Sequence, residues 1–142
     1  MTHLTSIWSR PVDLAALNEI TKGTFSDHLK ISFIDVTDDS LTAQMPIEGI
    51  HLQPMGRMHG GASAALAETV ASAAAYYCVP CESKRCVGIE LNINHLRAVQ
   101  DGFLRAVAKP LHRGKTTQVW EIKIYHNNNS LISAARLTLS VN

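Results

Sequence analysis

An α+β fold, in which an antiparallel sheet packs around one long helix, is predicted by three features of this sequence. Residues 62–78 are Ala-rich and contain neither Gly nor Pro, so they can form an uninterrupted helix about 25 Å long. Two strand-like segments precede this helix and four follow it, each bounded by turn-forming residues. The order of a short helix, two strands, a long helix and four strands is typical of an α+β architecture.

The composition fits one globular domain, which we expect to span residues 1–142. Apolar residues make up 46% and charged residues 18% of the chain, and no repeat or linker divides it. The formal net charge of +1 gives no indication of a nucleic-acid or membrane partner. No apolar run approaches the ~18 residues that cross a bilayer. Residues 1–10 lack the basic start and apolar core of a secretory signal, so we expect a cytoplasmic protein.

The three cysteines, Cys78, Cys81 and Cys86, are expected to be free thiols. An odd number of cysteines without a secretory signal argues against a disulfide framework. The spacing of Cys78 and Cys81 matches half of a zinc site, but a second pair and suitably spaced histidines are missing. We therefore expect no metal and interpret the cysteines as small apolar residues near a helix end.

The first predicted helix begins after Asp13, a residue that can cap a helix N-terminus. Leu14, Leu17 and Ile20 would lie on one side of this helix, and Gly23 would stop it. Two strands are predicted next, at residues 31–36 and 41–45, separated by a turn-rich cluster. Irregular structure is expected at residues 49–57.

The last four strands are predicted at residues 86–95, 102–111, 117–126 and 131–141. In the third of them, Trp120, Ile122 and Ile124 alternate with more polar residues, which indicates one buried face. Short loops would join these strands as antiparallel hairpins.

His59, Gly60 and Gly61 directly precede the long predicted helix. The first amides of a helix have no internal partner and carry the positive end of the helix dipole. Glycine lets another group approach these amides closely, which suits an oxyanion that develops when a carbonyl is attacked. A tight turn into the helix explains the glycine pair equally simply, and taken alone the pair favours the turn.

Glu68 lies on the long helix, on a face made of small side chains. The neighbours on this face are Ala64, Ala71, Ser72 and Ala75. A carboxylate buried on such a face must be paired, hydrogen-bonded or neutralised by a raised pKa, whereas a solvated one needs no function. Ser72, one turn later, could orient the carboxylate, a water or a substrate, or could simply permit close helix packing.

The spacing of His59 and Glu68 has a consequence for assembly. Nine residues separate them, about 13 Å along a helix axis, whereas reacting groups must lie within about 3 Å of one centre. If both motifs are functional, a two-fold dimer with antiparallel helices would place the N-terminal corner of each helix beside the other Glu68.

The segment from Gln53 to Ser72, QPMGRMHGGASAALAETVAS, resembles the signature of hotdog-fold acyl-CoA thioesterases of the PaaI-like branch. This branch includes 1,4-dihydroxy-2-naphthoyl-CoA thioesterases, enterobactin-pathway proofreading thioesterases and 4-hydroxybenzoyl-CoA thioesterases with a helical Glu. The resemblance extends almost end to end, through residues 7–8, 39–46, 87–95, 109–112 and 118–120. It implies a hotdog fold, with the sheet wrapped around the long helix.

The resemblance also implies roles for five residues of the signature. Glu68 matches the catalytic carboxylate, acting as nucleophile or as general base on water. The N–H of Gly60 matches the donor that polarises the thioester carbonyl. Gln53 and His59 match residues that orient the acyl group and its carbonyl, and Ser72 matches a helper beside the carboxylate.

Further residues are implied in substrate binding by the same resemblance. His95 matches a residue lining the aromatic acyl pocket, and Gly88 with the run His95, Leu96, Arg97 and Ala98 matches pantetheine- and nucleotide-side contacts. The loop that meets the coenzyme A nucleotide is matched by His112, Arg113, Gly114, Lys115, Thr116 and Thr117. Arg97, Arg113 and Lys115 could bind phosphates, although ordinary solvated charges are the alternative.

The activity implied is hydrolysis of acyl-CoA thioesters, with aromatic acyl groups of the 1,4-dihydroxy-2-naphthoyl or benzoyl type as first expectation. Coenzyme A is part of the substrate, and no cofactor is expected. A homodimer with composite sites, a homotetramer, an aryl carrier protein as partner and a place in menaquinone biosynthesis are further expectations from the resemblance. Relatives commonly carry aromatic and aliphatic residues where this chain has Met55, Arg57 and Met58, which bears on the acyl preference.

Two other functions are compatible with a hotdog fold. One is a dehydratase or hydratase that acts on acyl-CoA or acyl-carrier protein and likewise combines His with a carboxylate. The other is a non-catalytic acyl-CoA-binding module, which would need no carboxylate at position 68. Release of free thiol would distinguish the thioesterase from both.

Overall fold

A six-stranded antiparallel sheet dominates the computed structural model, which describes residues 5–142. Its strands run in the order β1-β2-β4-β5-β6-β3, so β1 and β3 are the edges. Their bounds are β1 Ser32–Val36, β2 Leu41–Pro46, β3 Cys86–His95, β4 Phe103–Arg113, β5 Thr117–His126 and β6 Leu131–Val141. Residues 1–4, which belong to the stretch used above to exclude a secretory signal, lie outside the described residues.

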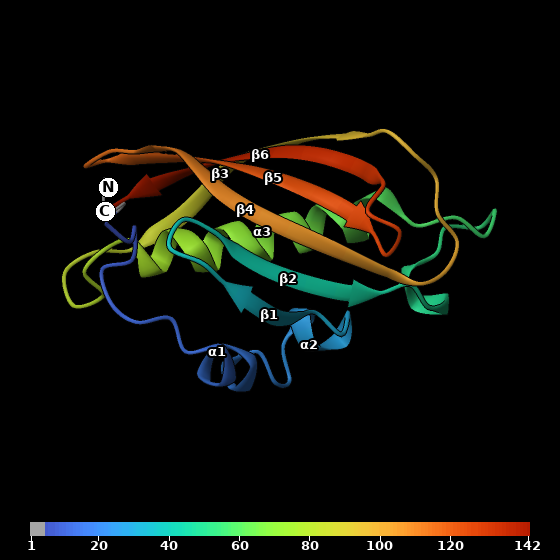
Figure 1. Ribbon diagram of the computed structural model, residues 1–142, viewed down its shortest axis with the longest axis horizontal. Helices are drawn as coiled ribbons and strands as arrows, with labels where there is room; N and C mark the ends of the chain where they lie inside the picture. Colours follow the sequence, from blue (N-terminus) through green and yellow to red (C-terminus); the bar gives the residue numbers. More distant parts are fainter. Residues whose placement is uncertain (1–4) are drawn as a thin grey trace.

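Within residues 5–142, four helical segments accompany the sheet: α1 Leu14–Ile20, α2 Phe25–His28, the 3-10 turn η1 Gly49–His51 and α3 Gly60–Tyr77. Figure 1 shows the sheet arching over α3, with α1 and α2 below β1. A sheet that wraps around one long helix is the predicted α+β architecture, the hotdog fold, which is confirmed. Within residues 5–142, no helix combines the length and the apolar character that crossing a bilayer requires.

The predicted bounds of three strands, β3, β5 and β6, are confirmed. The fourth, β4, starts one residue later and ends two residues later than predicted. Its pairing with β5 continues to Arg113 past a bulge between Pro110 and His112, which the hydrophobic pattern does not reveal. β1 begins one residue later and β2 ends one residue later than predicted.

The core lies between α3 and the concave face of the sheet. Leu66 and Val70 of α3 are fully buried. Trp120, Ile122 and Ile124 of β5 are also fully buried, as their alternation predicted. These contacts fix α3 against the sheet, and therefore fix which of its residues face the strand edges.

The first helix only partly matches its prediction. Asp13 caps α1 as expected, because its carboxylate accepts a hydrogen bond from the Ala16 N–H at 3.1 Å. Leu17 is buried whereas Ile20 is 71% exposed, so the side of the helix that these residues were predicted to share is buried at Leu17 and open at Ile20. The helix ends at Ile20, and Gly23 adopts φ +74° in the following turn. The segments α2 and η1 are too short to produce a detectable hydrophobic period.

The long helix begins at Gly60, two residues earlier than predicted, and ends at Tyr77. The interpretation that Gly60 and Gly61 precede the helix is therefore wrong, since they form its first turn. His59 is the N-cap residue, with an extended backbone, and its Nδ1 accepts a hydrogen bond from the Gly61 N–H at 2.8 Å. A histidine cap stabilises this early start even though glycine has a low helix propensity.

Candidate active site

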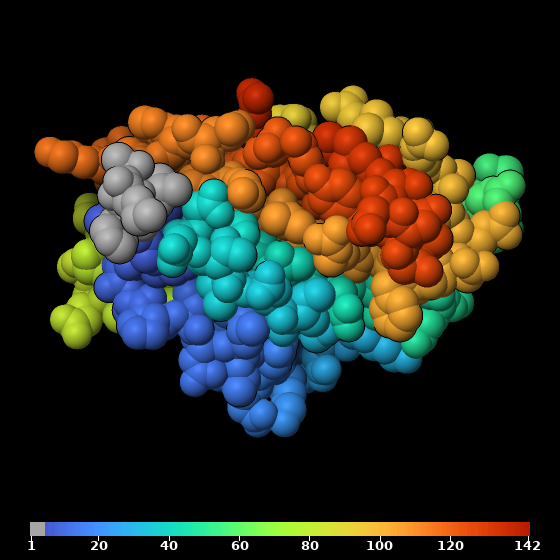
Figure 2. Space-filling model, viewed as in Figure 1, coloured from blue at the N-terminus to red at the C-terminus, as the bar shows by residue number. Residues whose placement is uncertain are grey.

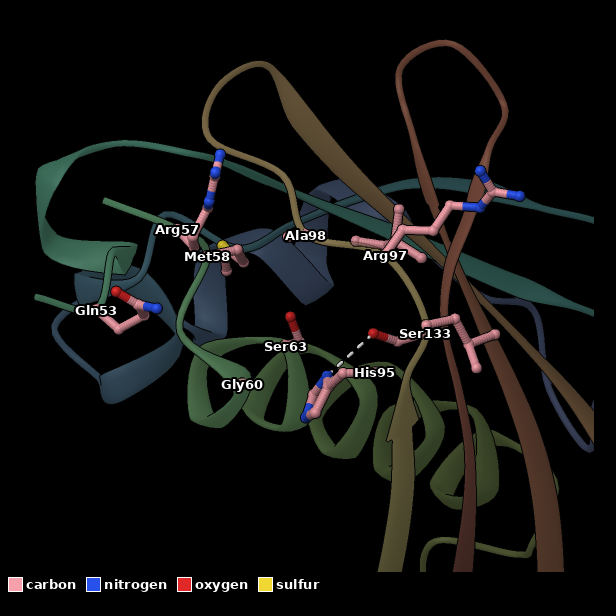
Figure 3. Close-up of a pocket in the computed structure, with 11 residues that line it drawn as sticks. Gln53, Arg57, Met58, Gly60, Ser63, His95, Arg97, Ala98 and Ser133 are labelled. Carbon is pink, nitrogen blue, oxygen red and sulfur yellow. Dashed lines mark hydrogen bonds between the residues drawn. The ribbon is translucent and has the colours of Figure 1, made fainter. Parts of the chain in front are cut away.

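A cavity of about 380 Å³ opens at the N-terminal end of α3. Its walls are the loop before α3, the first turn of α3, the end of β3 with the segment that follows it, and β6 (Figure 3). The lining residues are Gln53, Arg57, Met58, Gly60, Ser63, His95, Leu96, Arg97, Ala98, Ile132 and Ser133. Six of the predicted site residues therefore meet here: Gln53, Gly60, His95, Leu96, Arg97 and Ala98.

The first turn of α3 presents one unused backbone donor. The Gly61 N–H is bound by the His59 ring, and the Ala62 and Ser63 N–H groups donate to the His59 carbonyl at 3.0 and 3.3 Å. Among the described residues, the Gly60 N–H has no acceptor, and Gly60 lines the cavity. A free amide at the positive end of an 18-residue helix can stabilise an oxyanion.

His95 lies directly against this corner. A Cβ added to Gly60 would stand 2.7 Å from the His95 Nε2, so only glycine leaves room for the ring. The other ring nitrogen, Nδ1, is 3.2 Å from the Ser133 Oγ, and the two residues are register partners in the β3–β6 pair. The imidazole is thus held between β6 and α3, facing the cavity (Figure 3).

Gln53 offers a second donor to the cavity. Its Oε1 accepts a hydrogen bond from the Met55 N–H, which fixes the orientation of the amide. The amide nitrogen is then free to donate, and Gln53 lines the cavity. Pairing between Leu52 and Met58, together with a 2.7 Å bond from the Gln53 N–H to the Arg57 carbonyl, closes this loop into a tight turn.

Glu68 lies two turns further along α3. Its side chain is half-buried, and its Oε1 lies 2.3 Å from the place that a Cβ on Gly88 of β3 would take. Burial raises the pKa of the Glu68 carboxyl above its ordinary value. The carboxylate is thus neither free in bulk water nor enclosed. In the same chain it is about 12 Å along the helix axis from Gly60, and it does not line the cavity.

Ser72 follows Glu68 by one helical turn and is also half-buried. Within the part of the chain that is described, no hydrogen bond joins the Ser72 hydroxyl to the Glu68 carboxylate. The predicted helper role of Ser72 therefore stays a prediction.

The predicted nucleotide loop, residues 112–117, lies at the opposite end of the molecule from the cavity. Arg113 donates to the Ile7 carbonyl at 3.1 Å and lies beside Cys78, the C-cap residue of α3. Figure 2 shows this β4–β5 hairpin, in orange, protruding at the left, whereas the green tip of the loop before α3 protrudes at the right. One chain does not bring its own residues 112–117 to its own cavity.

Five cavity residues were not among the predicted site residues: Arg57, Met58, Ser63, Ile132 and Ser133. Ser63 could have been found, because it lies three residues after Gly60 and hence on the same helix face. Ile132 and Ser133 reach the cavity through the pairing of β6 with β3, which the sequence alone does not specify. Within residues 5–142, no group of three or more His, Cys, Asp or Glu side chains could hold a metal ion.

A hotdog sheet around a helix whose free N-terminal amide opens into a cavity, with a half-buried carboxylate on that helix, defines the class of hotdog-fold hydrolases. The sequence profile of the thioesterase superfamily matches residues 55–133. The chain belongs to this superfamily and is a thioester hydrolase.

Individual relatives agree with this assignment. The chain is 43% identical over 135 residues to the 1,4-dihydroxy-2-naphthoyl-CoA hydrolase of Escherichia coli, covering 95% of this chain and 98% of that protein. It is also 43% identical over 135 residues to the proofreading thioesterase EntH of Cronobacter turicensis, with the same coverage of 95% and 98%. These relatives are hydrolases, so they do not favour a dehydratase, a hydratase or a non-catalytic module.

Solved structures give the same result. A mutant thioesterase from Pseudomonas aeruginosa superimposes with a TM-score of 0.95 at 43% identity, covering 96% of this chain and 98% of that chain. A thioesterase from Haemophilus influenzae superimposes with a TM-score of 0.93 at 40% identity, covering 96% of this chain and 94% of that chain. The expected family is therefore confirmed.

Proposed function

We propose that this protein hydrolyses acyl-CoA thioesters, with Glu68 as nucleophile or general base and the Gly60 N–H as oxyanion donor. One observation carries the proposal: α3 presents a free N-terminal amide to a cavity and, two turns later, a half-buried carboxylate with a raised pKa. Acyl transfer needs both groups, because one activates the attacking oxygen and the other stabilises the charge that forms on the carbonyl oxygen.

The active site is composite, made from two copies of the chain. Glu68 and Gly60 of one α3 are about 12 Å apart along the axis, too far to act on one carbonyl. The edge strand β3 supports the arrangement, because its Val87 and Ile89 are 53% and 64% exposed and no strand within residues 5–142 pairs with its outer backbone edge. Antiparallel pairing of two β3 strands would also set the two α3 helices antiparallel, with each Glu68 towards the other Gly60.

Hydrolysis then follows in two steps. The thioester carbonyl accepts a hydrogen bond from the Gly60 N–H, while Glu68 of the partner subunit removes a proton from water, whose oxygen adds to the carbonyl carbon. The tetrahedral oxyanion collapses, the C–S bond breaks and the coenzyme A thiolate leaves and takes up the proton. In the nucleophile variant, the Glu68 carboxylate adds to the carbonyl carbon, the C–S bond breaks and the coenzyme A thiolate leaves, and water then cleaves the resulting anhydride.

Gln53, His59, His95 and Ser72 assist this chemistry. Gln53 donates a hydrogen bond from its free amide nitrogen to the acyl group. His59, as the N-cap residue, fixes the first turn of α3 and so orients the Gly60 N–H towards the carbonyl. His95 forms the wall beside the carbonyl. Ser72 supports the carboxylate from the next helical turn.

Coenzyme A binds outside the cavity in this proposal. Leu96, Arg97 and Ala98 lie at the mouth, where the Arg97 guanidinium is exposed and can meet a phosphate. The loop of His112, Arg113, Gly114, Lys115, Thr116 and Thr117 contributes from a neighbouring subunit, because it lies far from the cavity of its own chain.

An aromatic acyl group is the proposed substrate class. The cavity volume lies in the range of small-molecule sites, and the His95 ring, Met58 and Ile132 provide flat and apolar walls. The name of the Escherichia coli relative, 1,4-dihydroxy-2-naphthoyl-CoA hydrolase, supports a fused aromatic acyl group. An aryl carrier protein thioester is a second proposed donor. A homotetramer, a cytoplasmic location and a place in menaquinone biosynthesis stay predictions.

The test is turnover of the Glu68→Gln variant, followed by release of free thiol from aryl-CoA, alkyl-CoA and aryl carrier protein thioesters. We expect kcat to fall at least about 100-fold while coenzyme A binding persists, since the amide keeps the shape and removes the base. Glu19→Gln in α1 is the control, because Glu19 is exposed and forms an ion pair with the equally exposed Lys22. Unchanged turnover in Glu68→Gln would contradict the proposal. Ligand binding without thiol release in the wild-type protein would favour the binding module.

A further inference from the structure

We propose that Gly88 is a positioning residue for the Glu68 carboxylate. Because glycine has no side chain, the carboxylate can lie against the edge strand β3 in a space that any other residue at position 88 would fill. This inference rests on the function proposed for Glu68. The resemblance to thioesterases implies a different role for Gly88, a contact to pantetheine. In the present proposal, the space left by the absence of a side chain at Gly88 is filled by the enzyme's own carboxylate.

The geometry that carries the proposal is a close approach between α3 and β3. A Cβ added to Gly88 would stand 2.3 Å from the Glu68 Oε1, 3.4 Å from its Cδ and 3.5 Å from the Leu137 Cδ1. The carboxylate therefore occupies the volume that any side chain at position 88 would take. Backbone conformation does not require glycine here, because the glycines with positive φ are Gly23, Gly56 and Gly102. Space alone explains this glycine.

A bulge in β3 turns Gly88 towards the helix. The register runs from Gly88 opposite Leu139 to Glu90 opposite Thr138, so Ile89 is an extra residue on β3. Strict alternation from Leu91, which pairs with the buried Leu137, would direct Ile89 towards α3 and Gly88 away from it. The bulge reverses the directions of these two residues. Ile89 points outward and is 64% exposed, and Gly88 faces α3, where it leaves space for the Glu68 side chain.

Packing, and no polar bond, holds the carboxylate within the described residues. Among residues 5–142, Glu68 forms neither a hydrogen bond nor an ion pair, so packing on the Gly88 backbone sets its position. Because the clashing atoms are the end of a flexible side chain, a methyl group at position 88 can be accommodated by moving Glu68. The fold then survives, and the carboxylate leaves its place.

The test is a double-mutant cycle between Gly88→Ala and Glu68→Asp, with thioester hydrolysis as the readout. The shorter Asp withdraws its carboxylate from the space above position 88. We expect Gly88→Ala to lower kcat about 10- to 100-fold with Glu68 in place, because displacement by about 1 Å costs that much. In the Glu68→Asp background the same change should cost less than about 2-fold, since the two groups no longer meet. KM and coenzyme A affinity should stay unchanged.

The outcomes separate the possible roles of Gly88. If Gly88 contacts pantetheine instead, Gly88→Ala raises KM by the same factor in both backgrounds, and the proposal is overturned. An unchanged kcat in Gly88→Ala also overturns it. If Glu68→Gln keeps full turnover, the proposed function itself fails, whatever Gly88→Ala does. Gly49→Ala is the matched control, because nothing lies within 4 Å of a Cβ there and its φ is not positive.

Folding and assembly are checked on each variant by thermal unfolding and by molar mass in solution. A Gly88→Ala protein that misfolds with Glu68 but folds in the Glu68→Asp background supports the same steric coupling. Misfolding in both backgrounds overturns the proposal, because the defect would then not involve Glu68.

Discussion

His95 of β3 packs against Gly60 of α3. This is one of two contacts between β3 and α3 in which a side chain of one element packs against a glycine of the other. A Cβ on Gly60 would stand 2.7 Å from the His95 Nε2. In the second contact, between Glu68 and Gly88, a Cβ on Gly88 would stand 2.3 Å from the Glu68 Oε1. Each glycine thus accommodates a side chain that the proposed reaction uses. This explains why the edge strand and the helix lie so close together along the site.

Gly60→Ala is expected to lower kcat/KM about 100-fold, the cost of losing one oxyanion donor. The new methyl group displaces the His95 ring and covers the free N–H of the first turn. Steady-state kinetics with an aryl-CoA substrate would measure the effect. Gly49→Ala serves for comparison, because nothing lies within 4 Å of a Cβ there and its φ is not positive. Equal losses in the two variants would argue against the Gly60 N–H as donor.

Mixing two inactive variants should restore activity if the site is composite. In a mixed dimer of Glu68→Gln and Gly60→Ala chains, one site receives an intact carboxylate and an intact amide, and the other receives neither. Random exchange of subunits makes about half of the dimers mixed, with one of two sites intact, so about a quarter of wild-type activity is expected. Activity no higher than the mean of the separate variants would place both groups in one chain.

The raised pKa of Glu68 predicts a pH dependence of activity. Hydrolysis needs the carboxylate ion, so kcat/KM should fall as the pH drops through the raised pKa. The acid limb of the profile should therefore lie above about 4.3, the value for an ordinary Glu. An acid limb at the ordinary value would contradict the burial of this group in the active assembly.

The same pKa predicts an effect on stability. The folded state binds the Glu68 proton more tightly than the unfolded state, so this group's stabilisation is present below the unfolded pKa and is lost as the pH rises through the folded one. Glu68→Gln should therefore raise the urea midpoint at pH 7, with a difference that shrinks towards pH 4. A difference that is constant with pH would point to packing instead of charge.

The sequence predicts the strands and the helix of this protein better than it predicts the site. Strand bounds follow from patterns such as Trp120, Ile122 and Ile124, because burial on one face imposes a period of two. Ile132 and Ser133 were not predicted, since they reach the cavity only through the pairing of β6 with β3. The bulge at Ile89 breaks the period and leaves no compositional signal. Position-specific roles came from the resemblance of residues 53–72 to a known signature.

His51 is expected to be a main stabilising residue of the loop that carries Gln53. Its side chain is fully buried, its Nδ1 accepts a hydrogen bond from the Glu48 N–H at 3.1 Å, and its Nε2 therefore carries the proton and donates to the Leu29 carbonyl at 2.7 Å. Its own carbonyl accepts from the His59 N–H at 2.8 Å, which connects this residue to the cap of α3.

His51→Phe keeps the volume of the ring but leaves the part-buried Glu48 N–H and the buried Leu29 carbonyl without partners. Each such loss costs about 1–3 kcal/mol, so the free energy of unfolding should fall by about 2–6 kcal/mol. Urea denaturation would measure this as a lower midpoint at an unchanged m-value. His28→Phe is the control, because His28 is exposed and its change should stay within about 0.5 kcal/mol. Equal stability of the two variants would mean that the buried polar groups find other partners, and that the Gln53 loop does not depend on His51.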